Sequence, residues 1–406
     1  MSIVALGFWI SLAICVWVYA GYPAVLAILA VVRSRPIRRS SYQPRITVII
    51  PVHNRGEVIE RKVRATLANG YPHDSIEVVV ASDGSTDDTD VILRRLDDPR
   101  VRFLPLPRRG KAAAIDAAMA VATGEIIVFT DPDTQLDTGA LSRLVRNFAD
   151  PSVGGVAGRK VLTGSPGAPP IRRGRRLVAR LGEWQTRLES RIGSTASAHG
   201  ALHAMRRELY VPLSDTVAVD DAAVAMRLPL QGWRLVHDPL AVACIVPPVE
   251  PRAEFARKVR MARQCLRAVR GLGSTFRAAG FYSVTLTHRL LRCYVPVFML
   301  VMLITSASLA LDGHRQWQYA LLLQALFYAA AAVPLFRKGK SRRDMLDLFT
   351  IPHYFCVSGA ASLVALLSLI VRRGDMDWTT PELQPATAGA RAGRTAGSAP
   401  RAGAKG

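Results

Sequence analysis

The stretch GEIIVFTDPDTQ, residues 124–135, joins an apolar run to two aspartates held apart by a proline. Short uninterrupted apolar runs are typical of strands buried on both faces, as in parallel sheets. Two carboxylates at the end of such a strand repel each other unless a cation or a proton lies between them. Magnesium prefers one or two carboxylates together with substrate phosphates. Asp131 and Asp133 are therefore predicted to bind a metal that holds a diphosphate; an Asp-Pro turn followed by a helix N-cap is the structural alternative.

Three segments that precede this stretch have the same apolar character. RITVIIPV at 45–52, IEVVVASD at 76–83 and VRFLPL at 101–106 are strand candidates, and 125–131 is the fourth. Helical patterns separate them, including the alanine-rich GKAAAIDAAMAVA. Continuous apolar strands that alternate with helices predict an α/β fold, with a mostly parallel sheet covered by helices on both faces.

The carboxyl ends of parallel strands meet at one edge of a sheet, where α/β proteins bind ligands. Here that edge would collect Asp83, Asp131 and Asp133. Gly110 and Lys111 open the third predicted helix, whose free N–H groups and basic side chain would face an anion. The sequence contains no Walker and no G-x-G-x-x-G pattern, which disfavours P-loop NTPases and dinucleotide enzymes.

Both ends of the chain contain apolar stretches. Residues 3–32 carry no charge and exceed the roughly 20 residues needed to cross a bilayer. A cleaved signal peptide is disfavoured, because there is no basic n-region and no A-x-A-like site. Three more apolar stretches lie at about 293–311, 317–335 and 350–371. The sequence therefore predicts a globular domain tethered to a membrane on both sides.

Arginines follow the first apolar stretch directly, at positions 33, 35, 38 and 39. The positive-inside rule places such residues, and hence the globular domain, on the cytoplasmic side of the inner or plasma membrane. The five cysteines are scattered without a C-x-x-C spacing, which fits a cytosolic domain without a disulfide framework.

Lys plus Arg outnumber Asp plus Glu by 53 to 31, which gives a formal net charge of +22. No zinc-finger, RRM-like or basic-zipper pattern accompanies this charge, so we expect no nucleic-acid partner. Basic residues near a membrane attract anionic lipid headgroups, and a nucleotide-diphosphate substrate also needs positive charge nearby. We therefore expect membrane lipids and such a substrate as partners.

A second acidic pair, Asp220-Asp221, precedes an amphipathic helical pattern that ends at Gly232. One aspartate could be the N-cap of that helix. A carboxylate close to a metal-diphosphate site could instead accept a proton from an attacking hydroxyl, and we favour this second interpretation.

Two basic amphipathic helices are predicted, one of them shortly before the C-terminal apolar stretches. Residues 252–270 place an apolar face opposite several basic residues, which include Arg257 and Arg260, and residues 171–192 repeat this pattern. Such helices are typical of the membrane surface. Arg260 first, and one or two of its neighbours, could also neutralise a departing diphosphate.

Residues 45–270 resemble a family-2 glycosyltransferase, in particular the membrane-bound branch with the poly-N-acetylglucosamine, chitin-oligosaccharide and hyaluronan synthases. The resemblance is carried by VIIPVHNRGEVI, VVVASDGSTDDT, RRGKAAAIDAAMAVATGEIIVFTDPDT and VDDAAVAMRLPLQGWRL, in the family's order and spacing. It implies the nucleotide-diphospho-sugar transferase fold, a nucleotide-sugar donor that is UDP-linked, and a glycan or lipid acceptor.

The resemblance also implies roles for single residues. Asp131 and Asp133 occupy the D-x-D motif, with Asp133 the preferred direct ligand of Mg²⁺ or Mn²⁺, and Asp221 matches the general base. Asp220 stands beside that base, and Gly200 lies in a segment that resembles the acceptor-site loop. The residues implied at the donor nucleotide are Pro51, Val52, Glu57, Asp83 and Lys111.

One motif of the processive synthases is not intact. Their Q-x-x-R-W motif aligns with residues 257–261, where only the arginine, Arg260, is kept. The tryptophan that would stack on an acceptor sugar is missing, which favours transfer of one or a few sugars over polymerisation.

The sequence thus predicts a membrane-bound, metal-dependent, inverting glycosyltransferase of the hexosyltransferase type, acting on a surface polysaccharide or glycolipid. A nucleotidyltransferase with a similar sheet, or a nucleotide-sensing subunit of an export system, is the alternative. The predicted regions are an N-terminal membrane helix, a cytosolic transferase domain, basic interfacial helices, a C-terminal membrane region and a disordered tail, at 1–33, 40–250, 251–292, 293–371 and 381–406.

Overall fold

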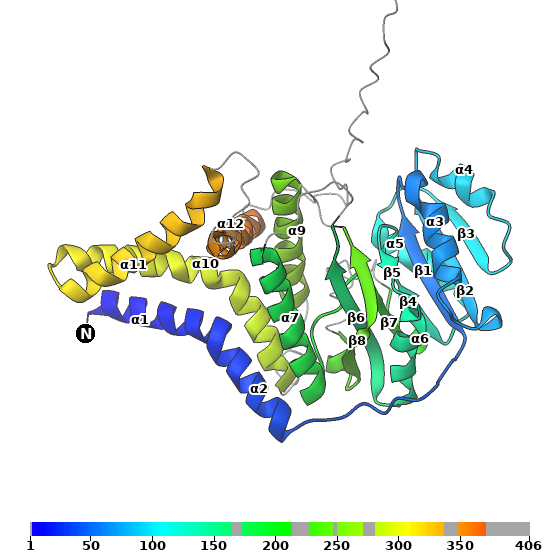
Figure 1. The fold of residues 1–406 in the computed structure, drawn as a ribbon, viewed down its shortest axis with the longest axis horizontal. Helices are drawn as coiled ribbons and strands as arrows, with labels where there is room; N and C mark the ends of the chain where they lie inside the picture. Colours follow the sequence, from blue (N-terminus) through cyan, green and yellow to red (C-terminus); the bar gives the residue numbers. More distant parts are fainter. Residues whose placement is uncertain are drawn as a thin grey trace, which may run out of the picture. The chain divides into compact units, whose positions relative to one another are not determined.

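The computed structural model of the chain describes residues 2–164, 173–212, 227–246, 250–270, 281–336 and 348–370. Within residues 1–374, a central α/β domain adjoins helices that come from both ends of the sequence (Figure 1).

The four predicted strands form one half of the central sheet. β1 (Ile46–Val52) pairs in parallel with β2 (Ile76–Asp83) and with β4 (Ile126–Phe129), and β2 pairs in parallel with β3 (Val101–Leu106). Every residue of β1, β2 and β4 is buried. Their uninterrupted apolar sequences thus correspond to a sheet covered on both faces, as predicted.

The other half of the sheet makes it mixed. The full order is β3-β2-β1-β4-β7-β6-β8-β5. β7 runs antiparallel to both β4 and β6, β6 and β8 are parallel, and β5 is antiparallel to β8. All strands except β7 and β5 run in the same direction, so the expectation of a mostly parallel sheet is confirmed. The bounds of these strands are Gln135–Leu136 for β5, Val153–Leu162 for β6, His203–Arg206 for β7 and Arg234–Ile245 for β8.

Helices cover both faces of this sheet. Apolar residues of α3 (Gly56–Leu67), α4 (Thr89–Arg94) and α6 (Ala140–Val145) join one face in a single core, and α5 (Lys111–Val121) covers the other. Short helical turns also occur at η2 (His73–Ser75), η3 (Arg146–Ala149) and η4 (Arg207–Leu209).

Four helices in the described part of the chain are long and apolar enough to cross a membrane. The first is continuous over residues 3–32, through α1 (Ile3–Val16), a π-helical turn η1 (Trp17–Gly21) and α2 (Tyr22–Val32). The others are α10 (Phe281–Leu311), α11 (Arg315–Ala332), which continues into η6 (Val333–Leu335), and α12 (Thr350–Ile370). Each apolar stretch identified in the sequence is thus a helix.

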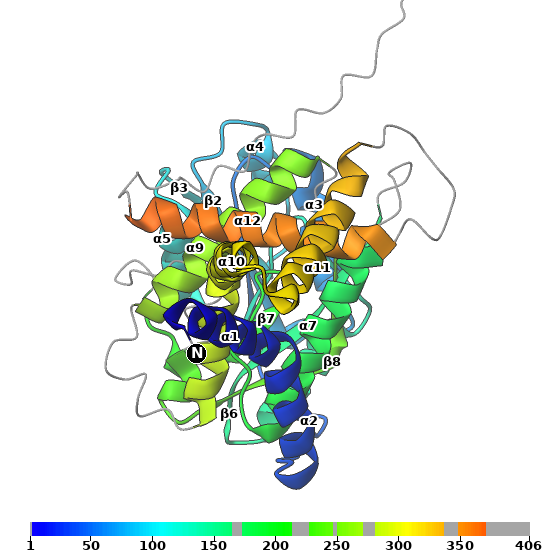
Figure 2. The ribbon, with the colours of Figure 1, turned by 90° about the vertical axis from the view of Figure 1, so that its left-hand side faces the viewer.

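These helices do not all run in the same direction. α1 packs along α10, which packs along α11, and these three extend away from the domain (Figure 1). α12 lies crosswise to α1 and α10 (Figures 1 and 2) and contacts α7 (Arg173–Ile192) and α9 (Pro251–Arg270). The apolar face of α9 packs against Cys293 of α10 and Ala361 and Ala365 of α12.

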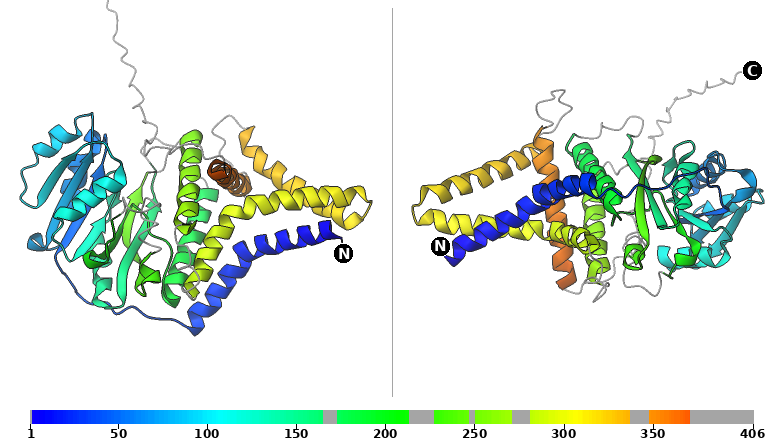
Figure 3. Two further views of the ribbon diagram at one scale, coloured as in Figure 1. Left: turned by 180° about the vertical axis from the view of Figure 1, so that it is seen from behind. Right: turned by 90° about the horizontal axis from the view of Figure 1, so that it is seen from below.

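The segment that joins α2 to β1 runs along the domain (Figure 3). The N–H of Arg35 donates to the carbonyl of Arg191 at 2.7 Å, and the Arg35 carbonyl accepts from the Arg234 guanidinium at 2.9 Å. The N–H of Arg38 donates to the Asp150 carboxylate at 3.2 Å. Residues 33–45 are therefore fastened to the domain.

Gly84, directly after β2, combines a positive φ of 62° with a close approach of two chain segments. A Cβ at this position would lie 2.8 Å from the Arg108 nitrogen. Gly70 has a similar φ of 78°, but a Cβ there would meet no atom within 4 Å.

We predict that Gly84→Ala destabilises the protein more than Gly70→Ala does. The left-handed backbone should cost each variant about 1–2 kcal/mol, but only the first must also displace the Arg108 backbone. The apparent Tm of both full-length variants in detergent is the measurement. Equal losses would contradict the close approach of residues 84 and 108.

Candidate active site

Three parallel strands bring the predicted site residues to one edge of the sheet. Val52 pairs with Ser82 and Ile49 pairs with Phe129, so β1, β2 and β4 end near one another. Asp83 is the last residue of β2, and Asp131 follows β4 by two residues. The register therefore places both acidic positions at the carboxyl edge, as predicted.

The loops that follow β1 and β2 are joined by hydrogen bonds. His53 Nδ1 lies 2.9 Å from the Asp83 carbonyl, and the N–H of Thr86 donates to Asn54 Oδ1 at 2.8 Å. The N–H of Gly56, at the start of α3, donates to Asp87 Oδ2 at 3.0 Å. These contacts hold the two loops as one rim of the site.

The carboxylate of Asp83 holds the turn that precedes α5. It is buried, and it accepts from the N–H of Arg109 at 2.7 Å, from the N–H of Gly110 at 3.0 Å and from the Arg108 guanidinium. Gly110 is the residue before α5 and has a φ of 95°. In this structure Asp83 therefore organises the start of the α5 helix, a role that the sequence pattern does not indicate.

Asp131 has a cation and a backbone contact of its own. Its Oδ1 accepts from Lys111 Nζ at 2.9 Å, and its N–H donates to the Gly200 carbonyl at 3.0 Å. Partial burial tends to raise the pKa of Asp131, but Lys111, together with Lys62 and His203, lowers it below its usual value. The carboxylate is therefore ionised at neutral pH, and Gly200 lies beside it.

Asp133 is the more accessible of the two acids, with 56% of its side chain exposed. The Nε of Arg55 lies 3.1 Å from both of its carboxylate oxygens. Arg55 is itself one-third exposed and sits in the loop before α3. Each aspartate of the D-x-D motif is thus balanced by a separate basic side chain.

The two carboxylates fit a metal that takes its other ligands from the substrate. No group of three or more His, Cys, Asp or Glu side chains is placed to hold a metal among the residues that the structure describes. The two carboxylates at this edge nevertheless match the way Mg²⁺ is held, by one or two carboxylates plus phosphate oxygens and waters. The partly exposed Arg55–Asp133 pair can separate at little cost, since such pairs contribute about 0–1 kcal/mol.

A buried lysine, which the sequence analysis did not single out, supports this loop. Lys62 of α3 is 6% exposed, and its Nζ donates to Thr130 Oγ1 at 2.9 Å and to the Thr134 carbonyl at 2.7 Å. Burial lowers its pKa to about 7, while Asp131 and Asp133 act in the opposite direction. In the sequence it appears as one of several charged residues on an amphipathic helix.

A second missed lysine, Lys160, lies between this edge and helices α7 and α9. Burial, then the charge of Arg257, lowers the pKa of Lys160 to about 8, and Asp131 and Glu254 oppose this shift. Lys160 of β6 therefore lies within electrostatic reach of both Asp131 and α9. On α9, Arg257 donates to Glu254 at 2.9 Å, and Arg175 of α7 donates to the same carboxylate at 2.9 Å. A lysine inside an apolar strand is the signal that could have revealed this position.

The remaining predicted residues are less directly placed. Pro51 and Val52 are buried within β1, while Glu57 is exposed in the first turn of α3. Arg260 is half-buried on α9. Asp220 and Asp221 lie outside the residues that the structure describes.

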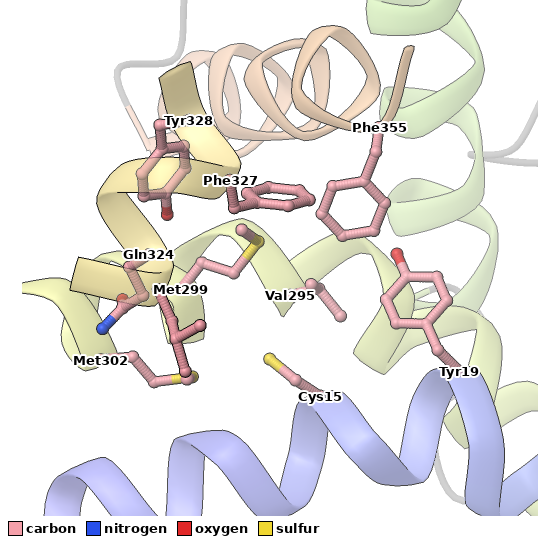
Figure 4. Close-up of a pocket in the computed structure, with 10 residues that line it drawn as sticks. Cys15, Tyr19, Val295, Met299, Met302, Gln324, Phe327, Tyr328 and Phe355 are labelled. Atoms are coloured by element: carbon pink, nitrogen blue, oxygen red, sulfur yellow. The ribbon is translucent and has the colours of Figure 1, made fainter. Parts of the chain in front are cut away.

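A separate pocket lies among the apolar helices and has a different chemistry (Figure 4). Carbon and sulfur atoms of side chains such as Met299, Met302, Phe327 and Phe355 line it, and the Cys15 thiol points into it. It suits an apolar chain and not a charged nucleotide.

A parallel half-sheet whose carboxyl edge holds a D-x-D motif between basic side chains is typical of nucleotide-diphospho-sugar transferases. Residues 47–211 match the family model described as Glycosyl transferase family 2. The central part of the chain is therefore a family-2 glycosyltransferase domain, as the resemblance implied.

The chain is similar to two kinds of curated protein. It is 27% identical over 235 residues to the poly-beta-1,6-N-acetyl-D-glucosamine synthase of Staphylococcus aureus (strain COL), and the matched region covers 54% of each chain. It is 26% identical over 285 residues to Glycosyltransferase AglD of Haloferax volcanii, which covers 68% of this chain and 43% of the relative. The chain thus spans about half the length of these curated relatives.

A solved structure resembles almost the whole chain. It is the mannosyltransferase PcManGT from Pyrobaculum calidifontis in complex with GDP-Man and Mn2+, with a TM-score of 0.64 and 26% sequence identity. The match covers 88% of this chain and 99% of the mannosyltransferase. The similarity therefore includes the helices outside the family-2 domain.

Proposed function

We propose that this protein is a membrane-bound, metal-dependent, inverting glycosyltransferase that moves a sugar from a nucleotide-diphospho-sugar to a surface polysaccharide or glycolipid. The observation that carries this proposal is the pair Asp131 and Asp133, held at the carboxyl edge of a family-2 domain with a basic side chain on each carboxylate.

The donor diphosphate would bind beside this acidic pair. Asp131 and Asp133 would hold Mg²⁺ or Mn²⁺, which supplies positive charge to the diphosphate as the bond to the sugar breaks. Lys111, at the start of α5, and Arg55 would contact phosphate oxygens once the metal takes over the carboxylates. The structurally similar mannosyltransferase is a complex with GDP-Man and Mn2+, so GDP-mannose is a candidate donor beside the UDP-sugar that the family resemblance implies.

The acceptor hydroxyl would attack the anomeric carbon from the face of the sugar opposite the departing diphosphate. Asp221, or less directly Asp220, would accept the proton of the attacking hydroxyl, which gives inversion at the anomeric carbon. Gly200 lies beside Asp131, where it can border the acceptor. Lys160, Arg257 and Arg260 would provide positive charge between this site and the membrane helices.

The crosswise orientation of α12 supports a specific topology. We propose that the helix of residues 3–32, α10 and α11 cross the membrane, while α7, α9 and α12 lie along its cytoplasmic surface (Figures 1 and 2). Leu177, Leu181 and Trp184 of α7 are exposed large apolar side chains that would enter the interface. Three crossings leave the transferase domain and the arginine-rich tail on the same side.

We predict that Asp133→Asn lowers sugar transfer by about 10²–10³-fold, because charge stabilisation of the leaving diphosphate is lost. The assay incubates membranes with radiolabelled UDP-sugars and GDP-mannose and Mg²⁺ or Mn²⁺, then separates lipid-soluble from polymeric product. Asp137→Asn is the matched control, since Asp137 lies directly after β5 and pairs with Arg143 at 3.6 Å. A folded Asp133→Asn variant with parental turnover would overturn the metal site.

Asp221→Asn is expected to reduce transfer by about 10²–10⁴-fold, the contribution typical of a general base, while donor binding stays unchanged. Transfer rates and nucleotide affinity should be measured on the same preparations. Asp220→Asn should retain most of the activity. The reverse ranking of the two variants would assign the base to Asp220.

The proposed topology predicts that a reporter fused after residue 406 lies in the cytoplasm. In a Gram-negative host, green fluorescent protein should be fluorescent there and alkaline phosphatase inactive, whereas alkaline phosphatase fused after Gly313 should be active. An active phosphatase at the C-terminus would show that α12 crosses the membrane.

A further inference from the structure

Lys62 occupies a position that packing alone does not explain. It lies on the face of α3 that also buries Ile59, Val63 and Thr66, and 6% of it is exposed. A buried cation is costly unless charges and hydrogen bonds compensate it. The groups that Lys62 contacts therefore indicate why a lysine is kept at this position.

The hydrogen bonds of Lys62 enclose the D-x-D turn. Its Nζ contacts Thr130, the residue before Asp131, at 2.9 Å, and the carbonyl of Thr134, the residue after Asp133, at 2.7 Å. The turn is closed by the N–H of Thr134, which donates to the Asp131 carbonyl at 3.2 Å. One side chain thus fixes both ends of the segment that carries the two acids.

Thr130 and Asp131 also contact the loop of residues 199–201, which precedes β7. Thr130 Oγ1 donates to the Ala201 carbonyl at 2.8 Å, and the N–H of Asp131 donates to the Gly200 carbonyl at 3.0 Å. Lys62 therefore links α3, the D-x-D turn and the 199–201 loop through Thr130. A neutral amine keeps two N–H donors, so these two hydrogen bonds do not depend on its protonation.

We propose that Lys62 is a positioning residue of the metal-diphosphate site, which acts through Thr130 and Thr134 to hold Asp131 and Asp133 in the geometry that binds the cation. This inference rests on the proposed function. It assigns to α3 a role in metal binding although α3 supplies no ligand.

The role makes an unusual prediction for Lys62→Met. Removing a positive charge near two carboxylates should by itself strengthen the binding of a divalent cation. Loss of the two hydrogen bonds should instead weaken it by about 10- to 100-fold, the range seen when groups that orient metal ligands are removed. The two explanations therefore predict changes of opposite sign.

The experiment measures Mn²⁺ affinity by electron paramagnetic resonance on the purified full-length protein, with and without GDP or UDP. Lys62→Met is compared with Arg64→Met. Arg64 is an exposed cation on the same helix, and it pairs with Glu60. Thr130→Val removes the hydroxyl that accepts from Lys62 and keeps the charge. The double variant Lys62→Met/Thr130→Val tests whether the two residues act together, and the apparent Tm reports folding.

Weaker Mn²⁺ binding in Lys62→Met and in Thr130→Val, little further loss in the double variant and parental affinity in Arg64→Met would support the proposal. Parental or tighter binding in folded Lys62→Met would overturn it. If Lys62→Met does not fold, Thr130→Val decides by the same criterion. A parent protein that binds no Mn²⁺ would refute the proposed metal site itself, and this inference with it.

Discussion

Two like charges at the end of one strand are the constraint on which the rest of the site depends. Asp131 and Asp133 are separated by one proline, and their like charges repel each other unless positive charge lies nearby. The chain supplies that charge from two directions, with Lys111 from the start of α5 and Arg55 from the loop before α3. The metal and the donor proposed above would replace these contacts, so the two acids and the two basic side chains are already at the edge where the ligand would bind.

The first half of the fold could be predicted because its signal is local. β1, β2 and β4 are uninterrupted apolar runs, and the parallel arrangement of such strands brings their carboxyl ends together without further information. The second half could not. β7 is four residues long, and β8 is interrupted by His237, Asp238 and Pro239, so neither shows a clear period. Their antiparallel and parallel partners are set by contacts between distant segments.

A site residue could be predicted only where the local sequence pattern indicates its chemical role. Paired aspartates after a strand form such a pattern. Lys62 does not, because it follows Arg61 on a charged helix and only the packing of α3 shows which of the two is buried. Asp83 illustrates the opposite case. Its position was predicted, but the turn at residues 108–110 engages its carboxylate fully, and this depends on a loop 25 residues away. Likewise, the sequence shows an excess of basic residues, but only the structure shows that some of them lie beside the acids and others on α7 and α9.

The fastened segment between α2 and β1 determines how substrates can meet. Arg35 and Arg38 are hydrogen-bonded to the domain, so residues 33–45 are not a flexible linker. The domain is therefore held close to the end of α2. In the proposed topology, the reaction centre would therefore stay at a fixed distance from the membrane. An acceptor would then have to present its hydroxyl at that distance, so the length of its headgroup would become a criterion for selection.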